Sequence, residues 1–341
     1  MSISSPAPNR SAPRRRGPAL RTVLAAAGAT LALAGCGLFG SDGAAEPTST
    51  TRATTTSTTA PPVSTSRPPE LIDPGDEPRQ ALRVTYAEGD ETQITFTSDL
   101  QITQRSDGRT QRLDSPPIAQ TLTYTVGTVD DDGAEVTVRI DDIAAKGKGT
   151  RLTEEQLAAL DDELSPMVGA EGTGVVTPLG ELEDFRFEVP DDASDELAAK
   201  LDALGDQLPT LGPSLPAEPV GVGASWRTSS TASVGGAEVD TTTTVTVTGI
   251  EDGTLSYRAS VAVSADPQDL ALAGLADGTT ARLTASDLQG STTGSLGLDR
   301  VAMTLRTRLT GTQKIQLTAD AGTTELTQAL AIAYVAAPAS D

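Results

Sequence analysis

The chain has 341 residues, of which 25 are Lys or Arg and 47 are Asp or Glu, so its net charge is −22 at pH 7. It contains no histidine, which excludes Ser-His-Asp and Cys-His catalysis as well as histidine metal ligands. A surface this acidic repels nucleic acid and anionic lipid head groups. Aromatic residues make up only 3% of the chain, which argues against aromatic platforms for sugars or nucleic-acid bases.

Residues 1–35 have the layout of a secretory signal peptide. Five arginines form a positive segment, and a short run of mostly Ala and Leu follows from Val23 to Ala34. That run is too short to span a bilayer as a permanent helix, which takes about 20 apolar residues. It leads directly to Cys36, the only cysteine in the chain.

The segment Leu33-Ala34-Gly35-Cys36 resembles the lipobox of bacterial lipoprotein signals, which has Leu, a small residue, Gly or Ala, and then Cys. The resemblance implies that Cys36 becomes the lipidated first residue of the mature protein, held by acyl chains such as palmitate on the extracytoplasmic face of the cell membrane. Two or more acyl chains give stable anchoring. The alternative is a chance cysteine in an ordinary signal peptide.

Loss of the five arginines in residues 1–35 leaves 20 basic and 47 acidic residues in the mature chain. We therefore expect the protein to touch the membrane through its anchor and not through a basic patch. After Cys36, residues up to 80 are predicted to be a disordered tether, because Thr, Ser and Pro dominate and almost nothing there could form a core. The folded part is expected to begin near Ala81.

The remaining chain is predicted to be β-rich and antiparallel, because apolar residues alternate with Thr or charged residues over many segments. An N-terminal half is expected at residues 81–208, a Pro/Gly connection at 209–223 and a C-terminal half at 224–337. Two Thr/Val hairpins, at residues 123–133 and 244–253, look alike. A duplicated β unit and composition alone explain this likeness equally well.

Two amphipathic helices are predicted between the strands. Thr153 and Gln156 form a capping box before the first helix, which has leucines on one face and ends at Pro166. The second is expected to begin near residues 191–192 and to stop at Pro209. Each helix has one apolar face and should lie across a sheet. The expected fold class is α+β and β-dominated, with a curved antiparallel sheet and two short helices.

The chain carries few candidates for a chemical site. Asp130, Asp131 and Asp132 offer oxygen ligands that suit calcium, but the EF-hand spacing and its closing Glu are missing, so a hairpin turn is the better interpretation. Walker A, Rossmann, G-x-S-x-G and zinc patterns are absent from the sequence. We therefore predict no catalytic residue, metal or cofactor, and Trp226 is expected to be a core residue. A hydrolase that uses two carboxylates is the least favoured alternative.

The segments that carry a wider resemblance are Leu33–Cys36, Thr48–Pro69, Gly174–Gly180 and Pro219–Trp226. In these segments the chain resembles a group of uncharacterised lipoproteins of high-GC Gram-positive bacteria. Their shared layout is a lipobox, a Thr/Ser/Pro tether and one β-rich domain of unknown function, and the resemblance implies no activity. The outline is also similar to that of mycobacterial lipid-carrier lipoproteins, although no residue motif links them to this chain.

The predicted function is therefore that of a non-enzymatic, lipid-anchored envelope protein. Its one-sided strands and Leu-striped helices could enclose an apolar space, which favours an apolar or lipid ligand. The alternative is a structural or interaction module that docks an envelope protein through an exposed sheet edge. Nucleic acid is not an expected partner.

Overall fold

The computed structural model describes residues 65–339, except residues 114, 211, 235–236, 271, 273–274, 276–277 and 321. The predicted signal peptide, the lipobox residues Leu33, Ala34 and Gly35, and Cys36 lie outside the described residues. The strands are β1 (Thr65–Asp73), β2 (Glu91–Ser106), β3 (Arg109–Leu113), β4 (Ile118–Val129), β5 (Ala134–Ala145), β6 (Glu171–Val176), β7 (Leu182–Phe187), β8 (Ser225–Val234), β9 (Ala237–Glu251), β10 (Thr254–Ala265), β11 (Gln268–Leu270), β12 (Thr280–Gly297), β13 (Met303–Ala319) and β14 (Gly322–Pro338).

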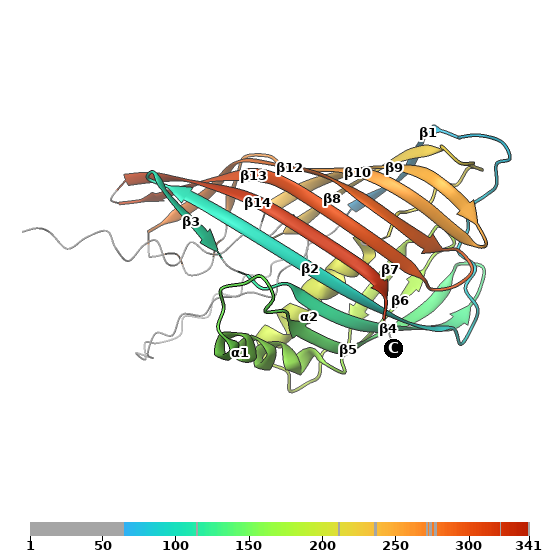
Figure 1. The fold of residues 1–341 in the computed structure, drawn as a ribbon, viewed down its shortest axis with the longest axis horizontal. Helices are drawn as coiled ribbons and strands as arrows, with labels where there is room; N and C mark the ends of the chain where they lie inside the picture. Colours follow the sequence, from blue (N-terminus) through green and yellow to red (C-terminus); the bar gives the residue numbers. More distant parts are fainter. Residues whose placement is uncertain are drawn as a thin grey trace, which may run out of the picture.

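All of these strands belong to one antiparallel sheet of 14 strands (Figure 1). From edge to edge the order is β1-β8-β9-β10-β12-β13-β14-β2-β4-β5-β6-β7, with β11 paired to β12 and β3 paired to β2. The sheet is open, because the order begins at β1 and ends at β7. The prediction of a β-dominated α+β fold is therefore confirmed.

The sheet is curved, as Figure 1 shows. Val239 on β9 and Ile102 on β2 belong to one buried cluster, although five strand steps separate β9 from β2. A flat sheet would hold these two strands about 24 Å apart. The curvature therefore creates an inner face, on which strands distant in the order approach each other.

Strand β1 corrects the predicted length of the tether. It pairs with β8 through Thr65↔Thr231 and Leu71↔Trp226, so the folded part begins before Ala81. An edge strand can be held by backbone hydrogen bonds alone, without an alternating pattern of apolar and polar side chains. The Thr, Ser and Pro composition of residues 65–73 therefore did not indicate strand β1. The register is interrupted between Arg67 and Glu70, where the two prolines lie, and an edge strand tolerates their missing N–H groups.

The N-terminal and C-terminal parts of the chain meet in this one sheet, because β14 pairs with β2 from Thr327↔Arg105 to Pro338↔Ile94. The C-terminal strands β12, β13 and β14 have 18, 17 and 17 residues. Gly290 and Gly311 lie inside β12 and β13. A Cβ at Gly290 would overlap the carbonyl oxygen of Arg308, so this glycine permits close packing and does not end the strand.

The two helices cover one end of the inner face. In α1 (Glu154–Leu164) the predicted capping box is confirmed, since the backbone N–H of Gln156 donates to Thr153 Oγ1 at 3.2 Å and that of Thr153 donates to Gln156 Oε1 at 2.9 Å. In α2 (Asp195–Gln207) the N-cap is Ser194, which lies two to three residues beyond the predicted start near Asp191 or Asp192. A turn closed by the backbone hydrogen bond from Ala193 to Pro190 delays the helix.

Three buried clusters make up the core. The first packs α1 and α2 against β4 to β7, the second lies between β9–β10 and β2–β14, and the third surrounds Trp226. Trp226 is fully buried, and its indole N–H donates to the carbonyl oxygen of Ser214 at 2.9 Å. The prediction that Trp226 is a core residue is confirmed.

Candidate functional site

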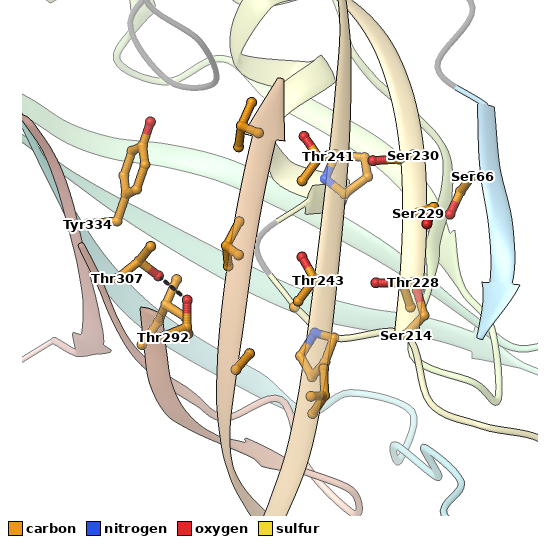
Figure 2. Close-up of a pocket in the computed structure, with 18 of the residues that line it drawn as sticks. Ser66, Ser214, Thr228, Ser229, Ser230, Thr241, Thr243, Thr292, Thr307 and Tyr334 are labelled. Atoms are coloured by element: carbon orange, nitrogen blue, oxygen red, sulfur yellow. Dashed lines mark hydrogen bonds between the residues drawn. The ribbon is translucent and has the colours of Figure 1, made fainter. Parts of the chain in front are cut away.

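A cavity of about 300 Å³ lies on the inner face of the sheet. Strands β8, β9, β10, β12, β13 and β14 contribute to its wall (Figure 2). The wall is completed by Ser66 of β1 and by Gln207, Pro209, Gly212, Pro213 and Ser214. Strands β8 and β14 are five steps apart in the order and would be about 24 Å apart in a flat sheet. The curvature of the sheet therefore forms the cavity.

The inner positions of the central strands supply most of the apolar wall. Alternate residues of a strand point to the same face, so a run of inward positions lines the cavity at every second residue. Leu305 and Leu309 on β13 are both buried. The other apolar wall residues on the sheet are Ala232, Val239, Val245, Ala259, Val261 and Val263.

Hydroxyl groups are interspersed among these apolar side chains. Thr292 Oγ1 and Thr307 Oγ1 form a buried hydrogen bond of 2.8 Å between β12 and β13. Figure 2 shows the Thr241 and Thr243 side chains following each other along β9. The remaining hydroxyl-bearing wall residues are Ser66, Ser214, Thr228, Ser229, Ser230, Tyr257 and Tyr334.

The wall carries no ionisable carboxylate, amine or guanidinium: among the described residues that line the cavity, none is Asp, Glu, Lys or Arg. This is a marked departure from the whole chain, in which 21% of residues are charged. An ion without a counter-ion loses its hydration in such a site and is strongly disfavoured. The cavity therefore suits an uncharged molecule.

Tyr257 is the one buried phenol of the wall. Burial raises its pKa to about 12, so the hydroxyl is neutral under physiological conditions. Its register partner on β12 is Gly294, and a Cβ there would lie 2.9 Å from Tyr257 Oη. The glycine leaves the space that the Tyr257 hydroxyl occupies.

The segment that closes one side of the cavity belongs to the Pro/Gly connection. Pro209, Gly212 and Pro213 line the cavity, together with Ser214. The carbonyl oxygen of Ser214 accepts the indole hydrogen bond of Trp226, and the backbone N–H of Leu215 donates to Leu179 at 2.9 Å. The sequence identified this segment only as a linker, because a Pro/Gly composition does not say what the linker lies against.

The acidic turn at Asp130 is a hairpin turn, as predicted. Asp130 Oδ1 accepts hydrogen bonds from the backbone N–H groups of Asp132 at 2.9 Å and Gly133 at 3.1 Å. In the part of the chain that the structure describes, no group of three or more acidic residues could hold a metal ion. Within the same residues, none of the helices is both long enough and apolar enough to cross a bilayer.

Searches against protein-family models and against curated proteins found no match to this chain. The fold and the cavity define a β-dominated protein with an internal, uncharged space.

Proposed function

We propose that this protein is a non-enzymatic, lipid-anchored protein of the cell envelope that holds an uncharged apolar or lipid ligand in the cavity between β8 and β14. The observation that carries the proposal is the lining of the cavity, which combines apolar side chains with hydroxyls and, among the described residues, has no charge. Hydrophobic pockets with a few polar groups are the usual form of small-molecule sites.

The volume limits the ligand. At about 300 Å³ the cavity is at the lower end of the range for ligand pockets, so it suits one acyl-sized chain or a small apolar molecule. A complete diacyl lipid exceeds this volume. The ligand is therefore a single-chain lipid or one chain of a larger lipid.

The position of the anchor supports exchange of such a ligand with a membrane. Ser66, at the start of β1, lines the cavity, and only residues 37–64 separate Cys36 from β1. A chain of that length reaches at most about 100 Å when fully extended. Lipidation of Cys36 would hold the cavity within that distance of the bilayer that supplies its ligand.

The experiment is native mass spectrometry of the mature chain from residue 36, secreted from an actinobacterial host, before and after organic extraction. The variant Cys36→Ser is used, because acyl chains on Cys36 would themselves compete for the cavity. The expected result is a releasable mass of lipid size. A ligand-free mass that persists after incubation with exogenous single-chain and diacyl lipids would contradict the proposal and favour the alternative, a module that docks an envelope protein.

A further inference from the structure

A row of four polar side chains crosses the inner face of the sheet, outside the set of residues that line the cavity. Ser286 on β12, Gln313 on β13, Gln328 on β14 and Gln104 on β2 are successive register partners. Gln313 and Gln328 are completely buried, and Ser286 and Gln104 are 7% and 6% exposed. We call these four residues the polar row.

The hydrogen bonds of the polar row are incomplete. Gln313 Nε2 donates to Gln328 Oε1. Gln313 Oε1, Gln328 Nε2 and Ser286 Oγ are buried atoms without a hydrogen-bond partner. Buried polar groups in proteins are nearly always paired, because an unpaired one has lost its hydration without compensation. The polar row therefore presents an acceptor, a donor and a hydroxyl that an additional molecule could satisfy.

Apolar layers enclose the polar row on both sides. Ile315 and Leu326 are register partners on one side, and Leu330 and Ile102 on the other. All four are buried in the second core cluster. The cavity-lining residues Val239, Val263 and Leu309 belong to this same cluster, so one continuous apolar cluster joins the wall of the cavity to the layers on either side of the polar row.

We propose that the polar row binds the head of the ligand whose apolar chain occupies the cavity, and that this head is a neutral hydroxyl group. A hydroxyl can donate to the unpaired amide oxygen and accept from the unpaired amide N–H. A carboxylate cannot donate a hydrogen bond, and it would be buried without a counter-ion. An alkyl end can neither donate nor accept a hydrogen bond. The two glutamine amides can each be turned so that their oxygen and nitrogen exchange places. If both the Gln313 and Gln328 amides are turned, they still bond to each other and still leave one acceptor and one donor for the hydroxyl.

This proposal rests on the proposed function, and the test separates the two. The mature Cys36→Ser chain is titrated with three twelve-carbon compounds that differ in their end group. 1-Dodecanol carries the hydroxyl, 1-chlorododecane lacks it, and dodecanoate carries an anionic carboxylate in its place. Affinity is measured by displacement of a fluorescent naphthylamine probe. We expect the alcohol to bind at least tenfold more tightly than the chloride and the anion.

The variant Gln313→Met with Gln328→Met removes both amides at nearly constant side-chain volume. We expect it to lose the preference for the alcohol and to keep the affinity for the chloride. The matched control is Gln101→Met with Gln316→Met, which changes two exposed glutamines on β2 and β13. This control should retain the full preference.

Each outcome decides one of the two proposals. Failure of all three compounds to bind overturns the proposed function together with this inference. Equal binding of alcohol and chloride to the wild-type chain overturns the inference alone, and means that the polar row holds only internal water. A preference that persists in the double Met variant also overturns it. If the double Met variant does not fold, the inference is still tested by comparing the affinities of 1-dodecanol and 1-chlorododecane for the chain with an unchanged polar row.

Discussion

Thr292 on β12 and Thr307 on β13 share a hydrogen bond of 2.8 Å between their hydroxyls, inside a wall in which apolar and hydroxyl-bearing side chains are mixed. The two side chains are register partners and both are buried. Each hydroxyl is thus satisfied by the other, and the pair forms part of the cavity wall with neither of its two hydroxyls left unpaired.

Single and double substitutions of this pair should have unequal effects. Thr307→Val leaves the Thr292 hydroxyl buried without its partner and should lower the free energy of unfolding by about 1–2 kcal/mol. Thr292→Val combined with Thr307→Val removes both polar groups and should cost less than either single change. The coupling between the two hydroxyls is measured by urea unfolding of the wild type, the two single Val variants and the double variant. Additive changes in the free energy of unfolding would contradict the pairing.

A charge placed inside the cavity should abolish ligand binding. Val261 and Ala262 are neighbours on β10, but Val261 lines the cavity and Ala262 is exposed on the other face. Val261→Lys puts an ammonium group against an apolar wall and should weaken binding of 1-dodecanol at least tenfold. Ala262→Lys adds the same charge outside and should leave the affinity unchanged. Equal losses in both variants would place the ligand elsewhere.

The buried tyrosines should make stability fall at high pH. Burial raises the pKa of Tyr257 and of Tyr86 to about 12, from an ordinary value of about 10. A phenol whose pKa is raised by folding stays neutral in the folded chain while it ionises in the unfolded one. The contribution of these two tyrosines to stability should therefore be constant below about pH 10 and fall between about pH 10 and 12.

This pH dependence is checked by urea unfolding and by phenolate absorbance in parallel. Tyr257→Phe should reduce the loss of stability above pH 10, because one of the shifted phenols is removed. Phenolate absorbance of the native chain should rise mainly above pH 11. A rise centred at pH 10 for all four tyrosines would show that these side chains are exposed.

Removal of β1 should destabilise the sheet edge. A chain that begins at Ala81 lacks the strand that pairs with β8, and it exposes Trp226 beside the former position of Leu71. We expect lower thermal stability, faster proteolysis near β8 and concentration-dependent association, because an uncovered edge strand pairs with other chains. A chain that begins at residue 60 is the control. Identical behaviour of the two chains would show that β1 contributes nothing to the fold.

Local patterns in the sequence predicted the local elements well. The Thr153–Gln156 capping box and the hairpin turn at Asp130 depend on contacts within a few residues, and both have the expected hydrogen bonds. The predicted start of α2 was two to three residues too early, because Asp191, Asp192 and Ser194 are all good N-cap types. Only the turn before Ser194 distinguishes them. The alternating pattern alone does not show the full extent of β12 and β13, because a glycine such as Gly290 or Gly311 interrupts the pattern without ending the strand.

The sequence by itself determined the acidic charge, the absence of histidine chemistry and the β-dominated class, because these depend on composition and on local alternation. The lipid anchor at Cys36 stays a prediction from a short contiguous motif. Only the tertiary structure decided that β1 covers β8, that the Pro/Gly connection closes a cavity, and that Gln313 and Gln328 are neighbours. Alternation tells which residues face inward on each strand. It does not tell which strands are adjacent or how far the sheet curves, and the cavity and the polar row depend on both.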